Sequence, residues 1–241
     1  GRHGCMIKNN DEFPIFDPVT EQHIGYKPRA VVHTKGHWHK GVQANIIRPN
    51  ESGTFDILVQ LRSTDVDIGD EKYDQSLATQ MIREDDLDEK ITLQRGLKNE
   101  LGITSYKAVL VPIKCHIIKT YIEHPGTNNR ELIRLYMVEC SSDQEPISCT
   151  NKIKSIQWME WGSFLQFFNG RQNDFTKTAQ FYFSNKAVLS IIEIMGKAMV
   201  QNEEISSDEQ MYRFLHIDKW PVATYTLQGE HIEETLKGGY L

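Results

Sequence analysis

Two neighbouring β-favouring runs constrain the fold of this chain most strongly. The first reads GVQANIIRP at residues 41–49, and the second reads TFDILVQLR at residues 54–62. The residues that join them, Pro-Asn-Glu-Ser-Gly at 49–53, have the composition of a turn, because Pro fixes its own φ angle and Gly tolerates a positive one. Apolar runs on either side of such a turn predict a β-hairpin. We therefore expect a sheet that contains this hairpin.

An α-helix is predicted next, after an acidic loop. Residues 64–90 are acidic and show little periodicity, which indicates a loop. Asp86 or Asp88 can act as the helix N-cap, because a short carboxylate side chain accepts hydrogen bonds from the first free backbone N–H groups. Gly102 suits the position just after the helix. The apolar stripe expected between them consists of Ile91, Leu93, Leu97 and Leu101. We predict a helix over residues 88–101.

Further strands and helices are predicted along the rest of the chain. Strands are expected near residues 24–27, 107–118, 131–139 and 153–159, and helices near 161–169 and 177–200. This mixture predicts an α+β fold. The main domain is expected at residues 23–200, with an N-terminal segment at 1–22 and a C-terminal extension at 201–241.

Composition excludes several classes of protein. The 241 residues are 39% hydrophobic and 25% charged, which is ordinary for a globular protein. The net charge of −6 argues against binding to a nucleic acid duplex, which requires surplus Lys and Arg. A membrane span is not expected, because no run of about 18 apolar residues occurs. The four scattered cysteines form no C-x-x-C pair, which is more typical of buried thiols in an intracellular, reducing compartment.

Several spaced motifs surround the predicted helix. VVHTKGHWHKGVQANII comes first, LVQLRS and KYDQSLA follow, and the helix ends in RGLKNELGI at residues 95–103. In this order they resemble the Nudix hydrolases, and more narrowly the branch related to isopentenyl-diphosphate isomerase. The resemblance spans about residues 23–200 and implies a Nudix fold, with a mixed β-sheet sandwiched between helices. It also implies hydrolysis of a nucleoside- or prenyl-type diphosphate with Mg²⁺ or Mn²⁺.

The helix retains only part of the family signature, G-x5-E-x7-R-E-U-x-E-E-x-G-U, where U is aliphatic. Helical residues three and four apart share a face, so the signature aims three glutamates at Mg²⁺, which requires several oxygen ligands. Those positions here are Gly96, Asn99 and Glu100. Arg95 matches the arginine whose implied role is to orient the glutamates. The resemblance thus implies catalytic roles for Arg95 and Glu100, with Glu100 also a metal ligand.

The first half of the signature is also altered. The positions that require Gly and Glu hold Met81 and Leu87. An insertion of about two residues would bring Glu84, Asp85 or Asp86 to the glutamate position. The alternative is a solvated acidic loop with a helix cap, which we favour because charge runs usually face solvent.

Three residues outside the helix complete the candidate site. The segment NNRE resembles a strand on which isomerase-like proteins place acidic metal ligands. Glu131 is retained there and Asn129 replaces an acid, so Glu131 is a candidate catalytic residue and metal ligand, or it simply begins a strand. The same resemblance implies that Arg62, in LVQLRS, and Lys72, in KYDQSLA, bind substrate.

Histidines form a second group of candidates. His33, His37 and His39 lie close together in the sequence, and imidazoles so spaced can bind a transition metal. In the isomerases they are joined by a later Cys-Gly-His-Pro-like segment, which here reads Leu-Ala-Thr-Gln at 77–80. The essential Cys is missing, so the proton transfers of isomerisation are not expected. We favour a fold-related role for the histidines, because a metal site needs a complete ligand set.

Two functions remain open. One is metal-dependent hydrolysis of a diphosphate by Glu100, Glu131 and a displaced loop acid. The other is a Nudix fold that has lost turnover and binds a ligand or a protein partner. Loss of one transition-state interaction commonly costs about 10²–10³ in rate, so the missing glutamates favour weak or absent hydrolysis. The expected partner is a small molecule that contains a diphosphate.

Overall fold

The computed structural model describes residues 7–64, 71–120, 128–216, 222–228 and 231–237. The strands are β1 (Glu12–Phe16), β2 (His23–Pro28), β3 (Trp38–Pro49), β4 (Phe55–Arg62), β5 (Tyr73–Asp74), β6 (Leu77–Gln80), β7 (Tyr106–Leu110), β8 (Lys114–Thr120), β9 (Asn128–Cys140), β10 (Ile153–Glu160), β11 (Val222–Gln228) and β12 (His231–Lys237). The helices are α1 (Arg29–Lys35), η1 (Arg83–Asp85), α2 (Glu89–Leu101), α3 (Trp161–Gly170), η2 (Gln172–Asp174), α4 (Lys177–Ser184), α5 (Lys186–Gln201) and α6 (Asp208–Leu215).

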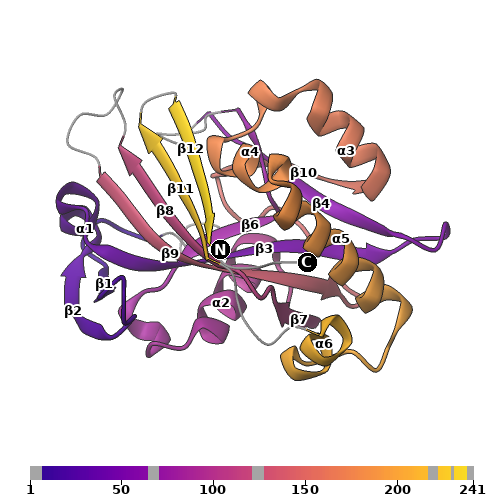
Figure 1. Cartoon of the computed structure of the whole chain (residues 1–241), viewed down its shortest axis with the longest axis horizontal. Helices are drawn as coiled ribbons and strands as arrows, with labels where there is room; N and C mark the ends of the chain where they lie inside the picture. Colours follow the sequence, from indigo (N-terminus) through magenta and orange to yellow (C-terminus); the bar gives the residue numbers. More distant parts are fainter. Residues whose placement is uncertain (1–6, 65–70, 121–127, 217–221, 229–230, 238–241) are drawn as a thin grey trace.

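These elements form an α+β fold around one mixed sheet, as predicted (Figure 1). The main path of the sheet is β10-β4-β3-β9-β8-β11-β12, and the other described strands pair beside it. The pairs β3–β9 and β8–β11 are parallel, whereas β3–β4, β4–β10 and β8–β9 are antiparallel. Helix α2 covers one face of the sheet, and α3, α4 and α5 lie on the other side (Figure 1).

The predicted hairpin is formed by β3 and β4. Ile47 pairs with Ile57, and the Asn50 side chain holds the turn by accepting hydrogen bonds from the backbone N–H groups of Ser52 and Thr54 at 3.0 and 3.1 Å. The arms then separate, and β5 and β6 fill the gap by pairing with β4 and β3 respectively. The prediction of a continuous loop over residues 64–90 was therefore wrong for these two strands, which are too short to show a periodic pattern.

Helix α2 has the ends that the sequence predicts. The Asp88 side chain accepts a hydrogen bond from the Lys90 backbone N–H, and Gly102 adopts the left-handed conformation with φ 68°. Leu93, Leu97 and Leu101 are buried against the sheet. Ile91 is 39% exposed, so the prediction that it joins the apolar stripe was wrong. Thr92 and Gly96 take part in the buried face instead.

The strand β3 separates two cores because its side chains alternate between the faces of the sheet. Val42, Ala44 and Ile46 pack with α2 in one core. Ile47 belongs to the other, which includes aromatic side chains from α3 and α4 such as Phe164. A residue's place in the alternation therefore decides whether it lies on the α2 side of the sheet.

Two predicted elements are each divided in the structure. The strand expected at 107–118 is β7 followed by β8, with Pro112 in the break, because Pro has no backbone N–H for the ladder. The helix expected at 177–200 is α4 followed by α5. Asn185 lies between them and caps α5 by accepting hydrogen bonds from the backbone N–H groups of Ala187 and Val188.

Both ends of the chain contribute strands to the sheet. Ile15 of β1 pairs with His39 of β3, and β11 pairs in parallel with β8. The expected N-terminal segment and C-terminal extension are thus continuous with the main sheet.

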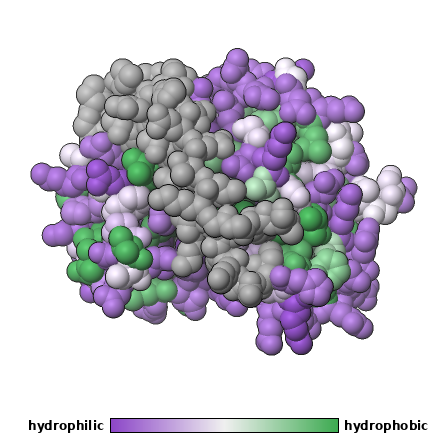
Figure 2. All heavy atoms as spheres, in the orientation of Figure 1, coloured by the Kyte–Doolittle hydropathy of each residue, from purple (hydrophilic) through white to green (hydrophobic). Residues whose placement is uncertain are grey.

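None of the helices in the described part of the chain is long and apolar enough to cross a membrane. Figure 2, in the orientation of Figure 1, shows that the described residues on the viewed face of the molecule are mostly hydrophilic, with apolar residues in small groups.

The orientation of α2 can be tested by two truncations of similar size. Leu97→Ala should destabilise the protein by about 2–5 kcal/mol, because Leu97 is fully buried and its loss leaves a cavity. Ile91→Ala on the exposed side should cost less than about 1 kcal/mol. Urea unfolding followed by circular dichroism measures both. An equal loss for the two variants would contradict the described packing of the helix.

Candidate functional site

Glu100 lies where three segments of the chain meet. It occupies the last turn of α2, and its backbone carbonyl accepts a hydrogen bond from the Cys149 N–H at 2.9 Å. The same loop continues to Lys152, whose carbonyl accepts a hydrogen bond from the Ser63 N–H at 2.9 Å. At that point Arg62 pairs with Ile153 across β4 and β10. The end of α2, the end of β4 and the start of β10 thus form one site.

Three cations influence the carboxylate of Glu100. Burial raises its pKa to about 7, while the charges of Lys152, Arg95 and Arg62 act in the opposite direction. Burial lowers the pKa of Lys152, and the charge of Glu100 opposes this shift. Two of these cations are themselves paired, because Arg95 contacts Asp85 at 2.9 Å and Arg62 lies 3.7 Å from Asp74.

Arg62 and Lys72, the predicted substrate-binding residues, lie beside this cluster. The Arg62 Nη1 is 3.7 Å from the Asp74 Oδ2, and its buried Nε has no hydrogen-bond partner in the described part of the chain. Lys72 is adjacent, because its backbone carbonyl accepts a hydrogen bond from the Arg62 N–H at 2.9 Å. The Lys72 ammonium donates to the Asn173 carbonyl at 2.7 Å. The backbones of the two residues are thus adjacent at the strand end, and the Lys72 side chain extends to η2.

Arg95 is committed to a neighbouring loop. Its guanidinium donates to both carboxylate oxygens of Asp85 at 2.9 Å and to the Gln80 carbonyl at 2.7 Å. Asp85 is 1% exposed and also accepts hydrogen bonds from the Thr92 hydroxyl and the Ile82 N–H. Arg95 therefore orients η1 and β6. The interpretation of this stretch as a solvated acidic loop was therefore wrong for Asp85, which is buried and bound to Arg95, whereas its neighbours Glu84 and Asp86 are exposed.

Gly96 is held to glycine by packing. A Cβ at this position would lie 2.9 Å from the Thr79 Cγ2 and 3.2 Å from a Leu77 methyl group. The position faces β6 and the sheet, so it offers no room for a glutamate without movement of the neighbouring strand. The carboxylate missing here is therefore excluded by the packing of α2 on β6.

Glu131 lies on the other face of the sheet from α2. Arg134, three residues further along β9, contacts Glu89 of α2 at 3.3 Å, so Glu131 points the opposite way by strand alternation. Its carboxylate accepts hydrogen bonds from the Asn129 and Gln80 side chains at 2.8 and 3.4 Å. The structure therefore does not bring Glu100 and Glu131 into one metal site, although the resemblance implies that both are ligands.

The histidines belong with Glu131. His39 is fully buried, with its Nε2 3.5 Å from the Glu131 carboxylate and its Nδ1 3.0 Å from the His37 carbonyl. Its ring packs against those of His33 and Phe13, at centroid distances of 5.3 and 5.5 Å. These contacts join α1 and β1 to β3, which supports the fold-related role.

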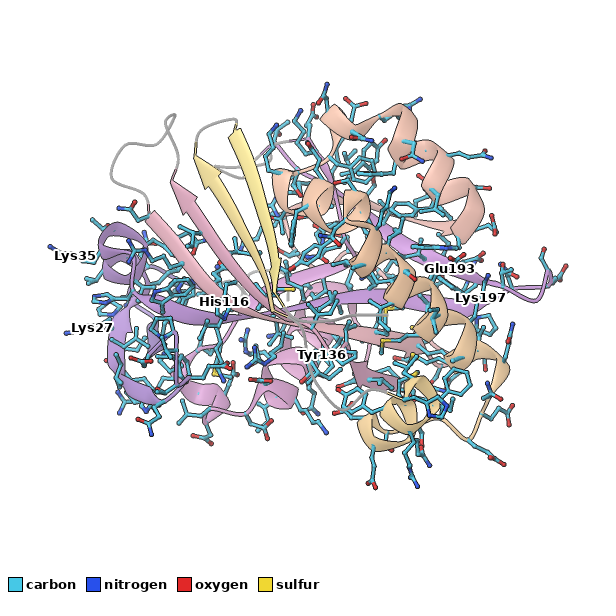
Figure 3. The ribbon with its side chains drawn as sticks, viewed as in Figure 1. Lys27, Lys35, His116, Tyr136, Glu193 and Lys197 are labelled. Carbon is cyan, nitrogen blue, oxygen red and sulfur yellow. The ribbon has the colours of Figure 1, made fainter. Side chains whose placement is uncertain are left out.

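His37 lies at a basic end of the molecule. Burial lowers its pKa, and the charges of Lys27, Lys35 and a protonated His39 act in the same direction. Lys27 and Lys35 project outward from the end formed by β2 and α1 (Figure 3). The positive charges that lower the pKa of His37 also disfavour a metal cation beside it.

The described residues do not fit the metal that the resemblance implies. Mg²⁺ and Mn²⁺ prefer several oxygen ligands, and no group of three His, Cys, Asp or Glu side chains in the described ranges is placed to hold a metal. Among the cysteines, Cys115 and Cys140 are buried free thiols and Cys149 is a partly buried one, while Cys5 falls outside the described residues.

Comparisons with known proteins find distant structural similarities only. No protein-family model matches the sequence, and no curated protein does. A NUDIX hydrolase from Alicyclobacillus acidocaldarius is 11% identical, with a TM-score of 0.49 over 67% of this chain and 95% of that one. The protein DR0079 from Deinococcus radiodurans is 13% identical, with a TM-score of 0.48 over 67% and 90% of the two chains. The NUDIX domain of NrtR from Shewanella oneidensis, solved with ADP ribose, is 12% identical, with a TM-score of 0.40 over 54% and 77%. These similarities are too low to assign a function.

The burial of Glu100 predicts a pH-dependent stability. The folded-state pKa of about 7 exceeds the ordinary 4.5, so the folded state binds the proton more tightly and loses stability as the pH rises through this interval. Glu100→Gln should therefore be more stable than the parent by about 1–2 kcal/mol at pH 8, and by much less near pH 5. Urea unfolding at the two pH values measures this, with the exposed Glu84→Gln as the control. A gain that does not depend on pH would contradict the assignment.

The packing of Gly96 predicts that replacement by Ala lowers the stability of the protein, whereas helix propensity alone predicts that it raises the stability. Gly96→Ala should destabilise the protein by about 1–3 kcal/mol through overpacking against Thr79, although Ala is favoured in helices by about 1 kcal/mol. Thr79→Ser removes the methyl group in the way, so Gly96→Ala should cost less in that background. Thermal or urea unfolding of the parent, the two single variants and the double variant measures these costs as a double-mutant cycle. Simple stabilisation of the parent by Gly96→Ala would refute the close contact.

Proposed function

We propose that this chain is a Nudix-type domain that binds a small molecule containing a diphosphate, with weak or no metal-dependent hydrolysis. The observation that carries the proposal is Arg62, whose buried Nε–H has no hydrogen-bond partner in the described part of the chain, at the end of β4 where the loop from α2 enters β10. Glu100 is the only signature glutamate retained in register on the helix, so the signature supplies one carboxylate to a metal where the family pattern has several.

The available hydrogen-bond donors support an anionic ligand. Arg62 has a buried Nε–H without a described partner, and a guanidinium suits phosphate oxygens because it presents several donors in a plane. Lys72 donates to a neutral backbone carbonyl, so its charge is not neutralised by that bond. Arg95 contributes less, since its pair with Asp85 already uses two of its N–H groups.

The surroundings of the other candidate metal ligands support weak or absent hydrolysis. The position of Gly96 is closed by packing, Asp85 is saturated by hydrogen bonds, and Glu131 lies on the opposite face of the sheet. Among the described acids that the resemblance implies as ligands, Glu100 alone is left for a metal-dependent mechanism. Because each missing transition-state interaction costs about 10²–10³ in rate, the expected turnover is far below the usual enzymatic range of about 1–10³ s⁻¹.

Inorganic pyrophosphate is the simplest probe of the proposal. Isothermal titration in EDTA should show binding, and Arg62→Met should weaken it about 10–100-fold through the loss of charge-assisted hydrogen bonds. Arg83→Met is the matched control, because Arg83 is 55% exposed and pairs with Glu12 away from the site. Circular dichroism verifies that both variants are folded.

The rival function gives the opposite result in two measurements. A diphosphate hydrolase would release phosphate in the presence of Mg²⁺ at ordinary enzymatic rates, and Glu100→Gln would abolish that release. Under our proposal Glu100→Gln removes a negative charge from an anion site and therefore tightens pyrophosphate binding. Fast, Glu100-dependent phosphate release would overturn the proposed function.

A further inference from the structure

We propose that Asp74 is a positioning residue of the anion site, which holds the Arg62 guanidinium in place and leaves its hydrogen-bond donors available to a phosphate group. This inference rests on the proposed function and names a residue that acts on the ligand through Arg62. Asp74 is the last residue of β5 and pairs with Gln60 of β4, two residues before Arg62. It is 7% exposed.

One oxygen of the Asp74 carboxylate is fixed by two donors. Its Oδ1 accepts hydrogen bonds from the Thr176 hydroxyl at 3.0 Å and from the Gln75 backbone N–H at 2.9 Å. A carboxylate bound in this way cannot rotate freely, so the direction of its second oxygen is also determined. That second oxygen, Oδ2, lies 3.7 Å from the Arg62 Nη1.

Thr176, the hydroxyl donor, is held by the core of the protein. Its backbone N–H donates to the Tyr73 carbonyl at 2.9 Å, and its hydroxyl accepts from the Ala179 N–H at 3.2 Å as the N-cap of α4. The preceding residue, Phe175, is 1% exposed and belongs to the aromatic core. The core therefore positions Thr176, and Thr176 positions Asp74.

The contact between Asp74 and Arg62 suits a ligand-binding guanidinium. A separation of 3.7 Å is longer than a hydrogen bond, so the attraction between the charges holds the guanidinium while its N–H groups remain available. The Nε–H has no hydrogen-bond partner in the described part of the chain. The Arg62 side chain is 24% exposed, so an anion in solvent can reach the guanidinium.

The rival explanation is that Asp74 is only a neighbouring negative charge, and it predicts the opposite sign. A carboxylate beside an anion site repels the ligand, so its neutralisation would then tighten binding. If Asp74 positions Arg62, neutralisation releases a long flexible side chain, which must be ordered again when the ligand binds. The sign of the change in affinity therefore distinguishes the two explanations.

The first test measures pyrophosphate affinity by isothermal titration in EDTA. Asp74→Asn keeps the shape of the side chain and one acceptor oxygen but removes the charge, and it should weaken binding about 3–10-fold. Asp56→Asn is the matched control, because it removes the same charge from an Asp–Arg pair at the other end of β4, where Arg48 lies 3.0 Å away. Unchanged or tighter binding by Asp74→Asn would overturn the inference.

A second variant tests the same contact from the other side. Thr176→Val removes the hydroxyl that fixes Asp74 and should also weaken binding. The double variant with Asp74→Asn should bind no more weakly than Asp74→Asn alone, because Thr176 acts through Asp74. Ser207→Ala, which removes the N-cap of α6, controls for the loss of a helix cap. Additive losses in the double variant would refute the action of Thr176 through Asp74.

The last test needs no ligand and so separates the inference from the proposed function. The ¹H–¹⁵N heteronuclear NOE of the Arg62 Nε–H, assigned by its loss in Arg62→Met, should match that of rigid backbone groups in the parent. It should fall in Asp74→Asn, because the guanidinium is no longer held. If the parent binds no pyrophosphate, the proposed function fails, while the NOE still decides the role of Asp74. An unchanged NOE in folded Asp74→Asn would refute that role.

Discussion

The buried pair of Arg95 and Asp85 determines the geometry of the site. Both carboxylate oxygens of Asp85 accept from one guanidinium, which also binds the carbonyl of Gln80. One side chain thus joins α2, η1 and β6. A buried pair of this kind contributes orientation more than stability, because desolvation of the charges offsets much of their attraction. With α2 fixed in this orientation, Gly96 packs against Thr79, and the backbone carbonyl of Glu100 accepts a hydrogen bond from the Cys149 N–H.

The sequence predicts those parts of the fold whose signals are local. The ends of α2 follow from Asp88 and Gly102, and the β3–β4 hairpin follows from its turn residues. Strands β5 and β6 could not be predicted, because two and four residues show no periodicity and their partners are distant in sequence. Strands β1, β11 and β12 were missed although they are longer, because their partners are also distant in sequence. Their pairing with β3 and β8 is a long-range property of the sheet.

The residues of the candidate site also fall into those that a local motif predicts and those that depend on long-range pairing. Glu100, Arg95 and Arg62 can be found by motif, since their spacing within short segments carries the signal. Lys152 cannot, because a single lysine in a loop comes to the end of β4 only when β4 and β10 pair. Glu131 illustrates the opposite error: a motif match places it in the site, but strand alternation turns it toward His39 and away from α2. The sequence of a strand alone does not show which face of the sheet a helix covers.

Two independent barriers oppose a metal site at the end of α2. One is steric, since a Cβ at Gly96 would lie 2.9 Å from the Thr79 Cγ2, and the other is electrostatic, since the charges of Lys152, Arg95 and Arg62 act on the Glu100 carboxylate. They involve different segments and different physical forces, so reversal of one leaves the other in place. A glutamate forced into position 96 would still leave these cations in place, and removal of Lys152 would still leave one carboxylate. The departure from the family signature is therefore built into both the packing and the charge of the site, and restoring the helix sequence alone would not restore a metal site.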